Sequence, residues 1–247
     1  VVLGSNEVLD EVNLVMNAGE RLAIVGPSGS GKSTILRLLA GLVLPSRGSL
    51  QISGIEQNYL RLDQNNPPDV RLVFQNPALL ASLTVRENVG FLLEKQKVLS
   101  EDVINKKVIN CLKKVGLYDV AEKFPNQLSG GMQKRVSFAR ALISNSDRES
   151  DSIPLLLYDE PTAGLDPIAC TRIEDLIIKT TDTAEGCSIV VSHVSSTIER
   201  TANRVVLLYD GKFRWDGSID QFKQTENSYV KQFRTGNLLG PMQPEDL

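Results

Sequence analysis

The sequence predicts an α/β fold: a mostly parallel sheet covered by helices on both faces, with a second, helical lobe inserted into it. Short strand-like apolar runs alternate with helical periodicity at both ends of the 247-residue chain, a pattern typical of a parallel sheet. Between about residues 76 and 150 the periodicity is helical. Hydrophobic residues make up 41% of the chain and charged residues 23%, which is ordinary for a globular protein with a sizeable core.

Composition argues against several functional classes. The chain has 27 Lys and Arg against 30 Asp and Glu, a net charge of −3, so it lacks the overall charge of a nucleic-acid-binding domain, although a local basic patch is compatible with these totals. Its three cysteines are widely spaced without a C-x-x-C pair, which favours idle thiols in a reducing compartment over a disulfide framework or a zinc site. No apolar stretch reaches the ~18 residues of a membrane span. Any membrane role therefore requires a spanning partner.

The N-terminal part is expected to supply strands and one helix. A turn is expected at Ala18-Gly19, and a helix over 32–44 that ends near Pro45. Strands are expected at four apolar runs, namely 8–9, 12–16, 22–25 and 72–74. The sequence begins at Val1 without a methionine, so localisation is not read from its N-terminus.

The middle and C-terminal parts complete the predicted organisation. Amphipathic helices are expected at 101–115 and 132–143, and a polar surface loop at 144–153. Three core strands and two intervening helices follow, with strands at 155–158, 188–191 and 204–208 and helices at 168–179 and 196–202. We divide the chain accordingly into a core lobe (1–75 and 154–227), a helical lobe (76–153) and a C-terminal tail (228–247).

A phosphate-binding loop is the first chemical signal. The run Gly26-Pro27-Ser28-Gly29-Ser30-Gly31-Lys32-Ser33-Thr34 fits G-x-x-x-x-G-K-[ST], and the expected strand and helix flank it. Its glycines let backbone N–H groups wrap phosphates at a helix N-terminus. Lys32 is expected on the β- and γ-phosphates, and the Ser33 hydroxyl on Mg²⁺. A chance match in a chain of this length has odds of roughly 1 in 100, and the strand–loop–helix setting lowers them further.

Two adjacent acids end the strand at 155–158. On its own, Asp159-Glu160 reads equally well as a solvated acidic turn. Beside a phosphate-binding loop the roles separate: Asp159 is placed to hold Mg²⁺, and Glu160 to polarise an attacking water. Parallel sheets place their ligands at this carboxyl end of the strands.

A second rare motif precedes the helix at 132–143. In Leu128-Ser129-Gly130-Gly131-Met132-Gln133, Ser129 is a good helix N-cap, and that bland role fits equally well. The run also resembles the signature of ATP-binding-cassette (ABC) ATPases, a match with chance odds of roughly 1 in 100. The two motifs stand in the order expected of that family. The resemblance implies a RecA-like core lobe, an inserted α-helical lobe, and an ATP sandwiched between the phosphate loop of one subunit and Ser129, Gly130 and Gly131 of another.

The resemblance to ABC ATPases implies roles at further positions. Gln75 matches the glutamine that touches Mg²⁺ and the attacking water, and Asp166 lies in the loop that faces the partner subunit. His193 matches the histidine that contacts the γ-phosphate, although a lone histidine is more often structural. The chain departs from the family at the adenine-stacking position, where the aromatic residue is replaced by Leu3.

Within the superfamily, the chain resembles the ATPases of lipid transporters with MCE-domain partners. The stretches 72–89, 156–169, 195–212 and 229–242 are similar to those of the chloroplast trigalactosyldiacylglycerol importer and the bacterial Mla phospholipid system. The resemblance implies a second ATPase subunit, an integral-membrane permease and an MCE-domain lipid-binding subunit as partners, with no nucleic acid. It implies a peripheral place at the stromal side of the chloroplast inner envelope, with the cytoplasmic side of a bacterial inner membrane as the alternative.

Other functions stay open as alternatives. An ATPase of a small-solute importer or of lipoprotein release is the nearest rival. A soluble ABC protein acting on ribosomes or DNA usually carries two cassettes or a long coiled coil, which this chain lacks. A catalytically dead cassette is disfavoured because Lys32, Gln75, Ser129, Glu160 and His193 are all present.

Two apolar segments lack an obvious role in the ATP site. Leu79, Leu80 and Leu83 lie in an uncharged stretch after Gln75; they either anchor the helical lobe or line a groove for a permease helix. The tail stretch 229–239 carries too many apolar side chains to stay in water. We expect it to pack on its own ATPase domain or on the partner ATPase.

Overall fold

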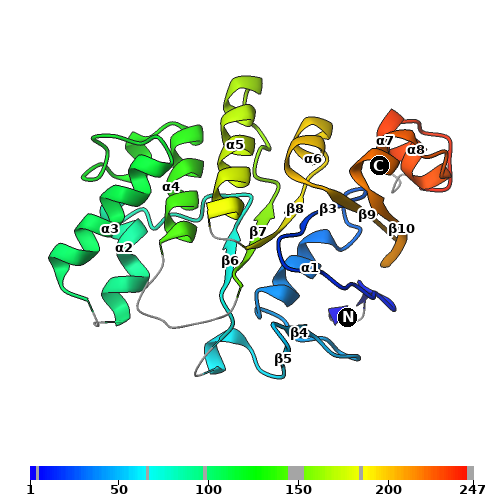
Figure 1. Cartoon of the computed structure of the whole chain (residues 1–247), viewed down its shortest axis with the longest axis horizontal. Coiled ribbons are helices and arrows are strands. Elements are labelled where there is room, and N and C mark those ends of the chain that lie inside the picture. Colours follow the sequence, from blue (N-terminus) through cyan, green and yellow to red (C-terminus); the bar gives the residue numbers. More distant parts are fainter. Residues whose placement is uncertain (4–5, 65–66, 97–98, 144–152, 184–185, 244–247) are drawn as a thin grey trace.

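The computed structural model describes residues 1–3, 6–64, 67–96, 99–143, 153–183 and 186–243. A six-stranded sheet in the order β10-β9-β3-β8-β7-β6 forms its centre (Figure 1). All neighbouring strands in it are parallel except β10, which pairs with β9 in the antiparallel sense. The strands of this sheet are β3 (Arg21–Val25), β6 (Val70–Val73), β7 (Leu155–Asp159), β8 (Cys187–Val191), β9 (Arg204–Tyr209) and β10 (Lys212–Ser218). The predicted α/β class with a mostly parallel sheet is confirmed.

Helices and small two-stranded sheets surround this centre. The helices are α1 (Lys32–Leu39), α2 (Val85–Gln96), α3 (Glu101–Lys114), α4 (Gly130–Leu142), α5 (Pro167–Thr183), α6 (Ser195–Thr201), α7 (Ile219–Gln224) and α8 (Ser228–Thr235), with 3-10 turns η1 (Arg61–Asp63) and η2 (Pro125–Gln127). The small sheets pair β1 (Val2–Leu3) with β2 (Asn6–Glu7), and β4 (Gln51–Ile52) with β5 (Ile55–Glu56). Among the described residues, none of the helices combines the length and apolar character needed to span a membrane.

Both faces of the sheet are buried, as expected for parallel strands. Along β7 the side chains alternate: Leu155 and Leu157 pack in one apolar cluster with α1, whereas Leu156 and Tyr158 pack in another with α4 and α5. A third cluster joins α6, α7 and α8 to β9. This two-residue alternation fixes the register of the strand, because a slip of one residue would exchange the side chains on the two faces.

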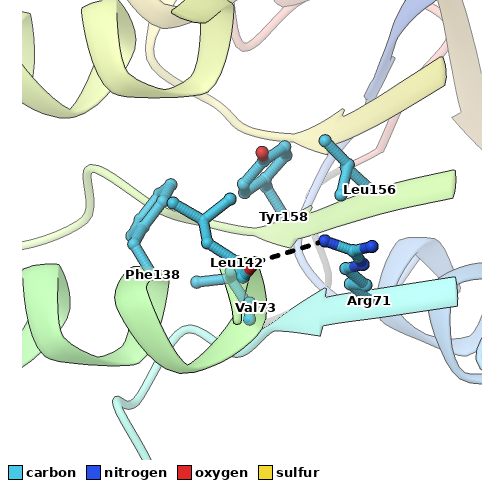
Figure 2. A pocket seen from close by; sticks show the side chains of 7 residues that line it. Arg71, Val73, Phe138, Leu142, Leu156 and Tyr158 are labelled. Atoms are coloured by element: carbon cyan, nitrogen blue, oxygen red, sulfur yellow. Dashed lines mark hydrogen bonds between the residues drawn. The ribbon is translucent and has the colours of Figure 1, made fainter. Parts of the chain in front are cut away.

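The helical lobe rests on the sheet through α4. Phe138 of α4 stacks on Tyr158 of β7, with ring centroids 5.3 Å apart, and Arg71 of β6 donates a hydrogen bond to the Leu142 carbonyl at 3.4 Å (Figure 2). Burial raises the pKa of Tyr158. The hollow that these residues line is filled by their own side chains. It is therefore a packed junction rather than a ligand pocket.

Several predicted boundaries need correction. The runs 8–9 and 12–16 are not strands in the structure; Val12, Leu14 and Met16 do alternate toward the core, but no neighbouring strand pairs with them among the described residues. The helix expected over 32–44 ends at Leu39, and Gly41 then adopts a left-handed φ of 68°. The strand expected at 72–74 is Val70–Val73. Residues 144–152 of the expected polar loop lie outside the described residues.

Candidate functional site

The phosphate loop joins β3 to α1, and two of its glycines are required by close backbone approach. Gly26 has a φ of 150°, and a Cβ there would lie 2.1 Å from the Leu208 carbonyl oxygen. Gly31 has a φ of 100°, and a Cβ there would lie 2.9 Å from the Leu9 side chain. Only glycine fits both conformation and space at these positions. The motif therefore marks a tightly enclosed turn at the N-terminus of α1.

Lys32 lies over this turn. Its Nζ donates hydrogen bonds to the carbonyl oxygens of Gly26, at 2.9 Å, and Pro27, at 2.6 Å. Burial lowers the pKa of Lys32, although the nearby Glu160 and Asp159 carboxylates act in the opposite direction. In the same loop, the buried Ser30 Oγ has no hydrogen-bond partner in the described part of the chain. The loop thus holds a confined cation and an unsatisfied hydroxyl, both suited to phosphate oxygens.

Ser33 and Asp159 bring two oxygen ligands together from opposite elements. Ser33 Oγ, in the first turn of α1, donates to Asp159 Oδ1, at the end of β7, over 3.1 Å. Within the described ranges, no group of three or more His, Cys, Asp or Glu side chains could hold a metal ion. Two protein oxygens nevertheless fit Mg²⁺, which at nucleotide sites takes most of its ligands from water and phosphate.

Glu160 and His193 form the third part of the site. His193 Nδ1 lies 2.8 Å from Glu160 Oε1, whereas the buried Glu160 Oε2 has no hydrogen-bond partner among the residues that the structure describes. The Glu160 side chain is 11% exposed and that of His193 63%. One carboxylate oxygen is therefore held by the histidine, and the other is left with unused capacity to accept a hydrogen bond.

The loop after Glu160 is held by a lysine that sequence reasoning missed. Lys134 Nζ, on α4, donates to the carbonyl oxygens of Pro161, at 3.3 Å, and Ala163, at 2.5 Å. Burial lowers the pKa of Lys134, while Cys170 and Glu160 oppose this shift. A lysine on an amphipathic helix resembles any solvent-exposed lysine in sequence. Only its position three residues after Gly131, the second signature glycine, pointed to a further role.

Asp166 has a local structural role in the monomer. Its Oδ1 accepts hydrogen bonds from the backbone N–H groups of Ile168 and Ala169, both at 3.0 Å. This caps the first turn of α5. The side chain is exposed, so the cap leaves it at the surface.

The signature motif and Gln75 make no hydrogen bond to this group within the described part of the chain. Ser129 is exposed, and its Oγ accepts a hydrogen bond from Met132 N at 3.3 Å, so the N-cap role is present. Gln75 is exposed just beyond β6. No hydrogen bond or ion pair recorded between described residues links Ser129 or Gln75 to Lys32, Asp159 or Glu160. In Figure 1, α4 lies in the lobe opposite α1, across β6 and β7.

The structure therefore gathers part of the predicted site and leaves another part separate. The structure brings together the phosphate loop, Ser33, Asp159, Glu160 and His193. The signature motif, in contrast, is exposed at the surface at Ser129 and Gly130. Gly130 illustrates this, because a Cβ there would meet no heavy atom of the described chain within 4 Å. The side chain of Leu3, at the position of the missing aromatic residue, lies outside the described residues.

Comparisons with known proteins agree with this geometry. A family model described as "ABC transporter" matches residues 9–163. The chain is 44% identical to "Protein TRIGALACTOSYLDIACYLGLYCEROL 3, chloroplastic" of Arabidopsis thaliana, covering 97% of this chain and 72% of that protein. It is 33% identical to the "Intermembrane phospholipid transport system ATP-binding protein MlaF" of Haemophilus influenzae, covering 97% and 89%.

A solved structure gives the same result for the fold. It is the dimeric structure of a post-hydrolysis state of the ATP-binding cassette MJ0796 bound to ADP and Pi. The TM-score is 0.74 at 32% identity, over 86% of this chain and 90% of that one.

Proposed function

The chain belongs to the ABC transporter family as an ATP-hydrolysing subunit, and from that premise we propose that it powers a membrane lipid transporter. Two similarities support the lipid part. One is the 44% identity to the chloroplast protein, and the other is the match to MlaF, whose name assigns it to phospholipid transport. The partners of this proposal are a second ATPase subunit, an integral-membrane permease and an MCE-domain lipid-binding subunit.

The observation that carries the catalytic proposal is the half-satisfied carboxylate of Glu160. His193 holds Oε1 at 2.8 Å, and Oε2 is buried without a partner among the described residues. Such an oxygen can accept a hydrogen bond from a water and orient it toward the γ-phosphate of ATP. Glu160 then acts as the base, and His193 fixes its orientation.

The remaining residues hold the nucleotide. Lys32 would exchange its bonds to the Gly26 and Pro27 carbonyls for phosphate oxygens, and the loop amides would cradle the other phosphates. Ser33 and Asp159 would hold Mg²⁺, with Gln75 reaching it when the helical lobe moves. When bound, Mg²⁺ neutralises charge that develops on the transferred phosphate.

The exposed signature motif supports a two-subunit site. Ser129 and Gly130 are exposed and lie apart from the phosphate loop, so one chain supplies only half of the proposed ATP pocket. The similar cassette of known structure is dimeric. We infer a homodimer in which Ser129, Gly130 and Gly131 of each subunit close on the ATP held by the other, and in which ATP binding and release switch the pair between two states.

The proposed location follows the same similarity. The relative from Arabidopsis thaliana is chloroplastic by name. We therefore place this chain at the stromal side of the chloroplast inner envelope through its permease, with the cytoplasmic side of a bacterial inner membrane as the alternative.

The proposal is tested by isolating the full-length protein from membranes with its partners and measuring lipid movement in reconstituted vesicles. Glu160→Gln should leave the complex assembled and ATP bound, and should stop lipid movement. Glu199→Gln changes an exposed carboxylate on α6 and is the matched control. A complex that moves a small solute but no lipid would overturn the lipid assignment, and transport by Glu160→Gln at the wild-type rate would overturn the catalytic one.

A further inference from the structure

A buried chain of polar side chains lies directly behind the catalytic loops. Thr162 Oγ1 and Thr197 Oγ1 are 2.9 Å apart, and Thr197 Oγ1 donates to Glu174 Oε1 over 2.9 Å. Glu174 Oε2 pairs with Arg200 Nε at 2.9 Å, and Ser196 Oγ also donates to Oε1, at 3.2 Å. We call Thr162, Glu174, Ser196, Thr197 and Arg200 the Glu174 network.

Three members of this network are almost completely enclosed. Thr162 is 2% exposed, Glu174 1% and Thr197 0%. A charged side chain is seldom buried to this extent unless it is paired. Replacing a buried ion pair by apolar side chains is often neutral or stabilising, so stability alone gives no reason for a carboxylate at this place.

The network has a fixed hydrogen-bond direction. A carboxylate only accepts hydrogen bonds, so Thr197 donates its single hydroxyl proton to Glu174. The bond between the two threonines therefore runs from the Thr162 hydroxyl to the Thr197 oxygen. Through Thr197, Glu174 thereby determines the orientation of the Thr162 hydroxyl group.

The network ties together three segments of the site. Thr162 follows Glu160 by two residues, Thr197 follows His193 by four, and Glu174 lies on α5, whose first turn is capped by Asp166. The Thr162–Thr197 bond thus connects the loop carrying Glu160 to the helix that begins after His193. Lys134 of α4 also holds the carbonyls of the residues that flank Thr162.

We propose that Glu174, Thr197 and Thr162 are positioning residues that hold the Glu160 carboxylate against His193. The inference rests on the proposed base role of Glu160. Glu160 has a left-handed φ of 44°, which a non-glycine residue keeps only where its surroundings enforce it. The buried Thr162 side chain provides such an anchor two residues away. Without it, the loop relaxes and Glu160 loses its alignment with the attacking water.

The test compares hydroxyl-deleting with hydroxyl-keeping variants of the full-length protein in its native assembly. Thr197→Val keeps the side-chain shape and removes the hydrogen bonds, whereas Thr197→Ser keeps the hydroxyl. We expect Thr197→Val and Glu174→Gln to lower kcat for ATP hydrolysis by about tenfold, the size of effect expected from misplacing a catalytic group by a fraction of an ångström. The KM for ATP should change by less than about twofold, because the phosphate loop is untouched, and Thr197→Ser should retain most of kcat.

A matched control lies next to Glu174. Asp175 also pairs with Arg200, at 2.7 Å, but its side chain is 49% exposed and it makes no recorded bond to Thr197. Asp175→Asn should therefore leave kcat within about twofold of wild type.

A second measurement separates positioning from a merely structural role. If the network acts through Glu160, adding Thr197→Val to Glu160→Gln should cause no further loss of the residual hydrolysis, since the group being positioned is already gone. A full additional loss in the double variant overturns the inference, as does a Thr197→Val enzyme with wild-type kcat. Should Thr197→Val fail to fold, the pair Thr162→Val and Thr162→Ser provides the same test. Thr162→Val removes only the hydrogen bond between Thr162 and Thr197, and Thr162→Ser keeps the hydroxyl.

The Glu160→Gln variant alone reports on the proposed function. If it hydrolyses ATP normally, the base assignment fails. If it is inactive while the threonine variants are normal, only the positioning role fails.

Discussion

At the scale of single residues, the carboxylate proposed as the catalytic base is held by its backbone as much as by its side chain. Glu160 has a φ of 44°, and its N–H donates to the Val191 carbonyl at the end of β8, at 2.9 Å. The end of β7 is thereby turned toward the strand that leads to His193. Backbone strain of this kind costs about 1–3 kcal/mol and is typical of functional positions.

Two substitutions at this scale should fail at different steps. Lys32→Ala removes the cation that faces the phosphates, so ATP affinity should fall by about tenfold or more. Glu160→Gln keeps that cation, so ATP should bind normally while hydrolysis drops by at least about 100-fold. Nucleotide titration and steady-state hydrolysis distinguish the two. Equal ATP affinity of Lys32→Ala and wild type would contradict the assignment of the phosphate loop.

The roles of five site residues remain predictions, but their selection from sequence has a physical basis. Lys32, Ser33, Asp159 and Glu160 lie in or beside short motifs, and His193 was proposed through the resemblance to ABC ATPases. Lys134 and the Glu174 network were not selected from sequence, because their partners come from distant segments and meet only through packing. A buried Glu174 has the same appearance in sequence as any glutamate on a helix surface.

At the scale of elements, the segment after Gln75 contains two leucines in different environments. Leu79 packs against the apolar cluster of the helical lobe, whereas Leu80 is 42% exposed. The buried Asn88 side chain fixes the loop by accepting from Leu80 N, at 2.7 Å, and donating to three backbone carbonyls. Arg140 of α4 holds the carbonyls of Pro77 and Ala78. The anchoring and docking hypotheses therefore apply to different side chains.

Charge substitutions should separate these two leucines. Leu79→Glu places a carboxylate at a half-buried position against the apolar cluster of the helical lobe and should lower the free energy of unfolding by about 1–3 kcal/mol. Leu80→Glu should leave folding and ATP binding intact and reduce association with the permease by about tenfold, as expected for a hot-spot side chain. Thermal unfolding and co-isolation from membranes measure the two effects. Normal permease association of Leu80→Glu would exclude it from the docking surface.

The C-terminal tail is the second element with a specific consequence. Val230 of α8 is fully buried in the cluster with α6 and β9, so the expected packing on its own domain is confirmed. The Gln232 side chain, on α8, holds the segment beyond the helix: it accepts from Met242 N, at 2.8 Å, and donates to Met242 O, at 2.7 Å. By contrast, Leu238 and Leu239 are 76% and 84% exposed. A contact of these leucines with a partner remains a prediction.

Removing the two hydrogen bonds between the Gln232 side chain and the Met242 backbone should destabilise the tail without affecting the ATP site. Gln232→Ala leaves two buried backbone groups unpaired, which costs about 1–3 kcal/mol. Chemical denaturation should show this loss, and hydrogen exchange should place it at 236–243, with unchanged ATP affinity. Gln224→Ala, at an exposed position, is the control.

Deleting residues 228–247 should have a larger effect and weaken ATPase pairing or complex assembly while ATP still binds. Unchanged assembly and transport would contradict the assembly role.

Element boundaries were less predictable than the presence of the elements. The core strands at 22–25, 155–158, 188–191 and 204–208 all lie within observed strands, because their apolar runs are buried on both faces. The run 12–16 was also expected to be a strand, but its side chains alternate between half-buried and exposed, and no strand pairs with it in the described part of the chain. Sequence does not reveal whether a partner strand is available. The division into lobes at residues 76 and 153 remains a prediction, since the apolar cluster of the helical lobe continues into β7 and α5.

At the scale of the whole molecule, each proposed ATP site draws on two chains. This can be tested with two heterodimers that carry the same two substitutions, Lys32→Ala in the phosphate loop and Ser129→Arg in the signature motif. In one heterodimer the substitutions are on separate chains, and in the other both are on the same chain. With the substitutions on separate chains, one site keeps both of its intact halves. With both on one chain, neither site does. Hydrolysis should therefore persist in the first heterodimer and fall by at least about 100-fold in the second.

The controls for this comparison are the two homodimers, which should both be inactive. Ser129→Arg also removes an N-cap from α4, a loss of about 1 kcal/mol, but both heterodimers contain that change. Equal activity of the two arrangements would contradict the shared site.

The order of strands in the sheet has a consequence for synthesis of the chain. β3, which leads into the phosphate loop, lies between β8 and β9; Arg21 pairs with Ser188, and Leu22 pairs with Arg204. At a translation rate of about 5–20 residues per second, the strand emerges roughly ten to thirty seconds before these neighbours exist. During that time the apolar residues of β3 have no neighbouring strands to pack with. Exposed apolar segments of this kind are what chaperones bind, so we expect the nascent chain to bind them. A fragment ending before β9 would contain the complete phosphate-binding motif, and yet one edge of its central strand would have no partner.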